Sequence, residues 1–336
     1  MRVFGIRIRR SKPFYTLFAM LLSVIIPTHR RRDTLRLCLE CLAKQSILRS
    51  FDRLRTSSAQ DDTMEVIVVS DGPDEKTAEM IQSLPWPFQF QYFAIPKSQQ
   101  GVARNRAAEK ARGKYALLIG DDIFLARDAC EVHLRAHEGQ RTMDPSARLR
   151  TGSGQWTKDQ RLRPSSRMAV LGHTTWDPTL RITPLMQWME QSGVQFGYPK
   201  LAAHENSVVP QNLQHWFTYT SNLSLPTHLL RHHPFREDIS LYGWEDVEWG
   251  RRLALAGINL LYEPAAKGYH HHPFTDQEVW ERSRKLGFSA MEMEKLVPRL
   301  RLQPQGLKKL AYRLFALLPI YKGKHCRAFL RGMREA

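Results

Sequence analysis

Short apolar runs that end in polar or acidic residues limit the possible folds of this chain more than any other feature. Three of them lie at 21–27, 65–69 and 115–119, and a further strand is expected at 90–95. The three apolar runs are rich in Val, Ile and Leu, and they are too short for helices. Runs of this kind are typical of strands that are buried on both faces of a parallel sheet.

Helical segments separate these strands. Residues 34–42 place Leu and Cys on one face, and Asp33 is a candidate N-cap for them. Further helices are expected at 77–84 and 101–111. Alternating strands and helices predict an α/β, doubly wound, mostly parallel sheet, and ligands bind such sheets outside the carboxyl ends of the strands.

Acidic residues stand at two of these carboxyl ends. Asp121 and Asp122 follow the strand at 115–119, and Asp71 follows the strand at 65–69. Carboxylate oxygens together with substrate phosphates are the ligands that Mg²⁺ and Mn²⁺ prefer. The acidic pair therefore predicts a metal site, although the same residues also occur in solvated turns.

A second group of polar residues lies in the later half of the chain. Glu245 and Asp246 follow Trp244 at the expected start of a helix, where acidic residues also act as caps. A carboxylate held near an acceptor hydroxyl is able to act as a general base, and Trp244 could stack on a sugar ring. The tract 270–272, which follows an expected strand at 258–262, is either a source of imidazole ligands or a surface feature.

The order of these segments resembles that of the GT-A glycosyltransferases of family 2. The matching segments lie within residues 21–272 and are LLSVIIPTHRR, EVIVVSDGPDEKT, GVARNRAAEKARGKYALLIGDDIF, FTYTSNLSLP and YGWEDVEWGRRLALAGINLLYEPAAKGYHHH. The resemblance implies the GT-A fold, a Rossmann-like sheet with an acceptor-side subregion, here followed by a C-terminal helical extension. It also implies inverting transfer of a sugar from a nucleoside diphosphate, by default UDP, with a divalent Mn²⁺ or Mg²⁺ as cofactor.

The resemblance assigns expected roles at the nucleotide. Asp71 corresponds to the acid that contacts the base, and Arg104 to the helix residue near base and ribose. Pro27 and Thr28 correspond to the strand edge that flanks the nucleotide. Asp121 is expected to support nucleotide binding beside the metal.

The remaining roles concern the metal and the chemistry. Asp122 is the expected metal ligand, and His270 and His272 are candidates for a further metal contact. Asp246 corresponds to the catalytic base, with Glu245 as its partner at the acceptor site. The sequence departs from the family pattern at Gly120, which replaces the first acid of the D-x-D motif, and at Ser70, where an Asp is common.

Five segments follow from these expectations. Residues 1–19 are expected to form a loose basic tail, and residues 20–138 the nucleotide-sugar-binding half. Residues 139–167 are expected to form a mobile basic insertion, residues 168–275 the acceptor and catalytic half, and residues 276–336 basic amphipathic helices, broken at Pro319.

The formal net charge of +17 limits the partners. Phosphorylated substrates and an anionic membrane surface fit this charge, whereas no motif indicates nucleic-acid binding. Cys38 and Cys41 lie in an apolar helical repeat, which favours a helix core in a reduced, cytoplasmic protein. The expected acceptor is a glycan or a lipid-linked sugar of the cell envelope, and the protein is expected to be cytoplasmic, with peripheral attachment to the inner membrane face as an option.

Two other classes of protein share some of these features. A nucleotidyltransferase uses a related sheet, but it would need a glycine-rich loop after the first strand, where this chain has Thr-His-Arg-Arg-Arg at 28–32. A non-catalytic membrane-peripheral binding protein could use the same charge, but it would not need Asp122, Asp246 and a histidine cluster together.

Overall fold

The computed structural model describes residues 20–50, 63–139 and 167–336. The predictions for residues 1–19 and for nearly all of the insertion at 139–167 lie outside these residues. No helix in the described part of the chain is long and apolar enough to cross a membrane.

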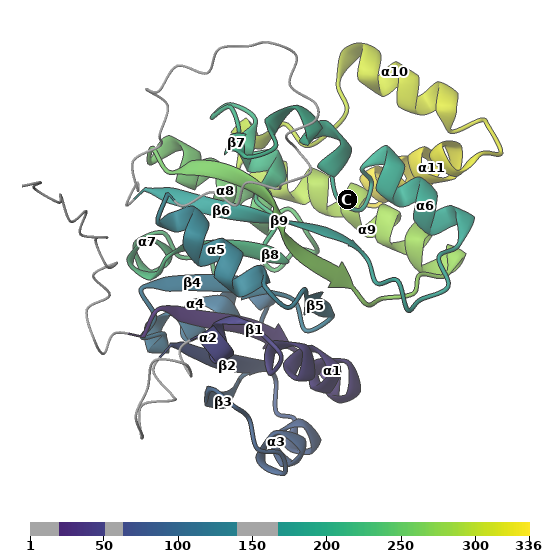
Figure 1. Cartoon of the computed structure of the whole chain (residues 1–336). Helices are drawn as coiled ribbons and strands as arrows, with labels where there is room; N and C mark the ends of the chain where they lie inside the picture. The colour runs from purple at the N-terminus through teal and green to yellow at the C-terminus, as the bar shows by residue number, and fades with distance from the viewer. Residues whose placement is uncertain (1–19, 51–62, 140–166) are drawn as a thin grey trace, which may run out of the picture.

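One mixed sheet organises the molecule (Figure 1). Its strands are β1 (Leu22–Thr28), β2 (Met64–Asp71), β3 (Gln89–Ile95), β4 (Tyr115–Ile119), β5 (Ile123–Leu125), β6 (Met168–Trp176), β7 (Ser207–Val208), β8 (Asn222–Pro226) and β9 (Asn259–His270). The order across the sheet is β3-β2-β1-β4-β8-β6-β9-β5, and β7 pairs with β9. Strands β1 to β4, β6 and β9 run in one direction, and β5, β7 and β8 run in the other. The predicted mostly parallel α/β sheet is confirmed.

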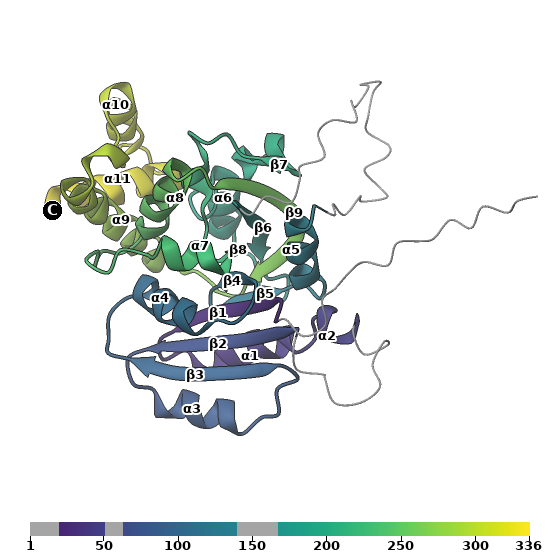
Figure 2. The ribbon, with the colours of Figure 1, turned by 90° about the vertical axis from the view of Figure 1, so that its left-hand side faces the viewer.

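Helices cover both faces of this sheet. They are α1 (Arg32–Leu42), α2 (Ile47–Ser50), α3 (Glu75–Gln82), α4 (Gln100–Lys110), α5 (Ala129–His137), α6 (Pro184–Ser192), α7 (Thr227–His232), α8 (Glu245–Leu255), α9 (Asp276–Leu296), α10 (Gly306–Phe315) and α11 (Tyr321–Glu335). In the turned view of Figure 2, β1, β2 and β3 lie side by side at one end of the molecule, and α9, α10 and α11 gather at the other.

The two-residue period of the strands explains the two cores. In β1, Ile25 packs into the core that contains Ala103 and Ala107 of α4, whereas Val24 and Ile26 pack into the core that contains Leu35 of α1. Successive side chains of a strand point to opposite faces, so a strand that is apolar at every position is buried on both.

The start of α1 differs from the prediction. Asp33 lies in the first turn of the helix rather than at its N-cap, which is Arg31, and no side chain caps this end. The chain enters the helix through Arg30 in the left-handed region, with a φ of 53°. This path directs Arg31 across the sheet to the acidic pair, a contact that a local capping rule cannot reveal.

The last long strand is also longer than the expected strand at 258–262. β9 continues to His270, and its pairing with β6 shifts register between Gly172 and His173. Pro264 and its neighbours suggest a turn locally, but pairing with β6 and then with β5 carries the strand onward. His270 is therefore fixed at a strand end beside β5.

Candidate active site

A large cavity opens at the carboxyl ends of β2, β4 and β9. Its volume is about 1260 Å³, and both halves of the chain line it. The predicted site residues among its lining are Asp71, Arg104, Asp122, Glu245, Asp246 and His270. The structure thus brings together residues that lie up to 199 positions apart in the sequence, a separation given by His270 and Asp71.

Asp71 is held rigidly at the end of β2. Its carboxylate accepts hydrogen bonds from Lys97 Nζ at 2.6 Å and from the Ser98 backbone N–H at 2.6 Å. Burial alone would raise the pKa of Asp71, but the hydrogen bonds from Lys97 and Ser98 hold it below its ordinary value. Asp71 is therefore a fixed negative charge on the cavity wall.

Arg31 binds both members of the acidic pair. Its Nη1 lies 2.8 Å from Asp121 Oδ1 and 2.8 Å from Asp122 Oδ2. Asp121 also accepts a hydrogen bond from Thr28 Oγ1 at 2.8 Å and is buried. Asp122 lines the cavity, whereas Asp121 is not among the lining residues. The sequence did not predict a role for Arg31 in the site, although the basic residues that follow β1 could have suggested one.

The two carboxylates differ in protonation. Burial and the adjacent Asp122 raise the pKa of Asp121 to about 7, against the effect of Arg31. Burial also opposes ionisation of Asp122, but His270 and Arg31 hold the pKa of Asp122 far below its ordinary value. Asp122 is consequently the member of the pair that carries a permanent negative charge toward the cavity.

The three consecutive histidines point to different neighbours. His270 Nε2 lies 3.3 Å from Asp122 Oδ2, and His272 Nδ1 lies 3.2 Å from Arg31 Nη2. His271 instead binds Asp177 Oδ2 at 2.7 Å. The structure therefore places His270 and His272 beside the acidic pair and its arginine and separates His271 from them, while their role as metal contacts stays a prediction.

The chemistry of Asp122 and His270 fits a divalent cation. A carboxylate suits Mn²⁺ or Mg²⁺, and imidazole is a common metal ligand. The buried His270 Nδ1 has no hydrogen-bond partner within the described residues. No cluster of three or more His, Cys, Asp or Glu side chains able to hold a metal is found in the described ranges. These residues would thus hold a cation only together with further ligands, such as phosphate oxygens of a substrate.

Helix α4 places Arg104 in the cavity wall. A Cβ on Gly101 would come within 3.1 Å of Phe235 Cβ, so the glycine permits this close packing. Asn105 fixes the same segment, because its amide both donates to Phe235 O and accepts from Phe235 N at 2.8 Å. Arg104 then lies buried over the Phe235 ring, with its guanidinium carbon 5.6 Å from the ring centroid.

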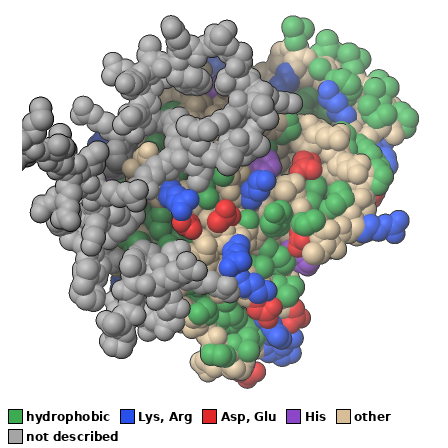
Figure 3. Space-filling model, viewed as in Figure 1, with side chains coloured by type: hydrophobic (Ala, Val, Ile, Leu, Met, Phe, Trp, Pro, Cys, Tyr) green, Lys and Arg blue, Asp and Glu red, His purple; other side chains and the backbone are tan. Residues whose placement is uncertain are grey.

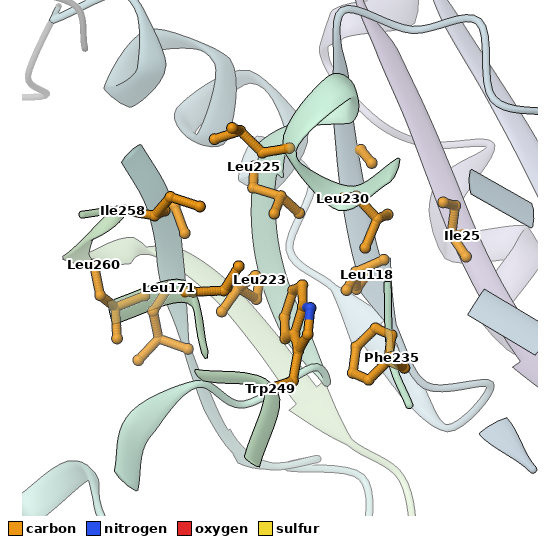
Figure 4. Packing of buried hydrophobic residues seen from close by; sticks show 14 of the residues in the cluster. Ile25, Leu118, Leu171, Leu223, Leu225, Leu230, Phe235, Trp249, Ile258 and Leu260 are labelled. Atoms are coloured by element: carbon orange, nitrogen blue, oxygen red, sulfur yellow. The ribbon is translucent and has the colours of Figure 1, made fainter. Parts of the chain in front are cut away.

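Helix α8 is anchored by Trp249. This indole is fully buried, stacks on Phe235 with the ring centroids 4.3 Å apart, and donates its N–H to His233 O at 2.6 Å. Figure 4 shows Trp249 at the centre of the core, between Leu223 and Phe235. The buried face of α8 therefore fixes its first turn, which carries Glu245 and Asp246, at the cavity.

Glu245, Asp246 and Arg104 form one charged group. Burial and the adjacent Glu245 raise the pKa of Asp246 to about 7, while Arg104 opposes this rise. Arg104 Nε and Nη1 and Glu245 Oε2 are buried without a hydrogen-bond partner in the described structure, and Gln100 donates to Glu245 Oε1. Buried polar groups usually have partners, so these atoms are candidates for contacts with a bound substrate.

Three predicted contacts are not seen directly. Pro27 and Thr28 are not among the cavity-lining residues, and the Thr28 hydroxyl is bound to Asp121. Roles for both at a nucleotide stay predictions. Trp244 lines the cavity, but its indole N–H donates to Leu286 O at 3.0 Å, which limits how it could stack on a sugar.

Matches of three kinds come from comparison with known proteins. Residues 23–184 match the model of glycosyl transferase family 2. A 123-residue stretch is 29% identical to the uncharacterized glycosyltransferase YfnE of Bacillus subtilis (strain 168), and it covers 36% of this chain but only 28% of that protein. The mannosyltransferase PcManGT from Pyrobaculum calidifontis, solved with GDP-Man and Mn²⁺, superposes with a TM-score of 0.54 at 14% identity, over 95% of this chain and 87% of that one.

These matches agree with the order of strands, acids and helices around the cavity. The likeness to PcManGT concerns the fold, since the sequence identity is low. Residues 23–184, a little under half of the chain, match glycosyl transferase family 2, and the chain has the GT-A fold.

Proposed function

We propose that this protein is a glycosyltransferase that moves a sugar from a nucleoside diphosphate, with UDP as the first candidate, to an acceptor hydroxyl with inversion of the anomeric configuration. The observation that carries the proposal is that Asp122 and His270 line the same cavity as Arg104, Glu245 and Asp246. One end of the cavity thus suits a diphosphate with its cation, and the other suits a proton transfer.

The charged residues of the cavity support the binding of a sugar nucleotide, the donor of the reaction. Asp71 and Lys97 form a fixed ion pair where the resemblance places the base, and Arg104, which lines the same cavity, has two buried nitrogens without a partner in the described structure. Asp122 and His270 would hold Mn²⁺ or Mg²⁺ together with the donor phosphates. When bound, such a cation neutralises charge that develops on the leaving diphosphate.

Asp246 supports the second part of the proposal, the activation of the acceptor hydroxyl. Its raised pKa of about 7 means that the carboxylate binds a proton readily at neutral pH, which suits a general base. Asp246 would accept the proton of the acceptor hydroxyl as the hydroxyl oxygen attacks the anomeric carbon. Glu245, held by Gln100, would orient the acceptor through its free oxygen.

The setting of the reaction is part of the proposal. The net charge of +17 and the C-terminal helices support a cytoplasmic enzyme that works at the inner membrane face, on a glycan or lipid-linked acceptor of the cell envelope. PcManGT was solved with a GDP-sugar, so GDP-sugars are tested beside UDP- and dTDP-sugars.

The test is release of nucleoside diphosphate from a panel of sugar nucleotides. We expect one donor to be consumed in Mn²⁺ and none in EDTA, and Asp122→Ala to remove the reaction. As a matched control, Asp33→Ala changes a carboxylate that is exposed on α1 and should leave the reaction unchanged. Equal release in EDTA and in Mn²⁺ would contradict the proposed metal site.

A further inference from the structure

Helix α10 exposes an apolar face. Leu307, Leu310 and Leu314 are 85%, 52% and 58% exposed, and none of the residues of α10 is buried. The apolar surface continues at Leu317, Leu318 and Ile320. Figure 3 shows this surface as a group of hydrophobic side chains over α10, at the upper right of the view.

The exposed leucines of α10 form one continuous apolar patch rather than scattered single residues. The spacing 307, 310 and 314 places the three leucines on one side of a helix. Single exposed leucines are normal, but a contiguous apolar patch on a folded protein marks a binding surface.

The charges beside the patch indicate what covers it. Lys308, Lys309 and Arg313 of α10 are all exposed. Between Lys295 and Arg334 the sequence contains no Asp or Glu. A leucine face inside a purely basic segment is the combination that binds the interface of an anionic bilayer. A second copy of this chain would instead bring the same positive charge into contact.

The same helix also contributes to the cavity. Lys308 and Tyr312 line it, together with Arg282 of α9 and His325 of α11, whereas the exposed leucines do not. One side of α10 therefore faces the cavity and another faces outward. A membrane that covers the leucines would lie directly beside the α10 end of the cavity.

We infer that α10 docks this protein on an anionic bilayer and holds the α10 end of the cavity against the lipid. Docking follows from the exposed residues alone. Its consequence, that the acceptor is an amphiphile whose polar head enters from the membrane, rests on the proposed function.

Vesicle flotation of the full chain tests the docking. We expect binding to phosphatidylcholine vesicles that contain phosphatidylglycerol, weaker binding in high salt, and little binding to pure phosphatidylcholine. The double variant Leu307→Glu/Leu310→Glu should lower partitioning by roughly tenfold or more, because two charged side chains replace apolar ones at the interface. Circular dichroism would verify that this double variant, and the control variant described next, are folded.

The chain offers a matched control. Leu255 at the end of α8 is 77% exposed but lies outside α10, so Leu255→Glu adds the same kind of charge elsewhere and should leave binding unchanged. Equal losses in Leu255→Glu and in the α10 variant would overturn the inference. Equal binding to neutral and anionic vesicles would also overturn it. The same holds if ultracentrifugation shows that the unaltered chain is a dimer and the α10 variant a monomer.

A second readout separates docking from catalysis. Donor hydrolysis in the absence of vesicles should be the same in the α10 variant and in the unaltered chain. Loss of vesicle binding with intact hydrolysis supports the docking role. Absence of hydrolysis in every variant, with vesicle binding intact, would refute the proposed function and leave the docking supported.

Discussion

Asp246→Asn should change activity and stability in opposite directions. The asparagine keeps the shape of the side chain but cannot take up a proton. Loss of a general base typically costs about 10² to 10⁴-fold in rate. Transfer should therefore fall by that factor, while donor affinity should hardly change, because the donor contacts proposed above involve other residues.

The stability effect follows from the raised pKa. The ordinary value is 3.8 and the folded value about 7, so the folded state holds this proton more tightly than the unfolded state. Between these two values the unfolded chain has lost the proton and the folded chain has kept it, so the free energy of unfolding falls as pH rises. Above pH 7 the full penalty, on the order of 4 kcal/mol, opposes folding.

Asp246→Asn removes this penalty. We expect the variant to be more stable than the unaltered chain at pH 8, by up to about 4 kcal/mol, and the difference to shrink toward pH 4. Urea unfolding across this pH range measures it. Asp33→Asn, which changes an exposed carboxylate, is the control and should show neither effect. The reasoning is refuted if Asp246→Asn retains normal turnover, or if it is less stable than the unaltered chain at pH 8.

Four further outcomes are expected. Asp122→Ala should abolish Mn²⁺-supported donor binding in calorimetry with an unchanged circular dichroism spectrum, and binding that persists would contradict its role. Asp71→Ala should weaken nucleotide binding but leave the ratio of affinities in Mn²⁺ and EDTA unchanged. Arg31→Ala removes the guanidinium group that binds both acidic side chains, and with it a positive charge that competes with a metal ion. The affinity for Mn²⁺, measured in the absence of the sugar nucleotide by paramagnetic resonance titration, should therefore rise by tenfold or more. Deletion of residues 1–19 should leave the thermal unfolding transition in place, and a chain that fails to fold would show that this segment is required.

The strands and their acidic ends could be predicted because local sequence determines them. An apolar run such as 65–69 admits few alternatives, and Asp71 marks where it ends. The parallel arrangement then brings Asp71 and Asp122 to one edge without any knowledge of distances. The contacts of Arg31 could not be predicted in this way, because they join residues 90 and 91 positions apart and depend on the left-handed Arg30.

Helix α10 shows a different limit of sequence reasoning. Its apolar spacing and the break at Pro319 predicted two short helices, as the structure has them in α10 and α11. The same spacing is compatible with leucines packed on the catalytic domain or exposed outward, because an amphipathic pattern identifies a face without naming what covers it. In the structure, Tyr312 packs toward Phe329 of α11, with ring centroids 5.8 Å apart, and Lys322 of α11 lies over the ring of Phe315. Leu307, Leu310 and Leu314 make up a different, exposed side of the helix. The leucine face is therefore open to a binding partner, and vesicle flotation tests whether that partner is an anionic bilayer.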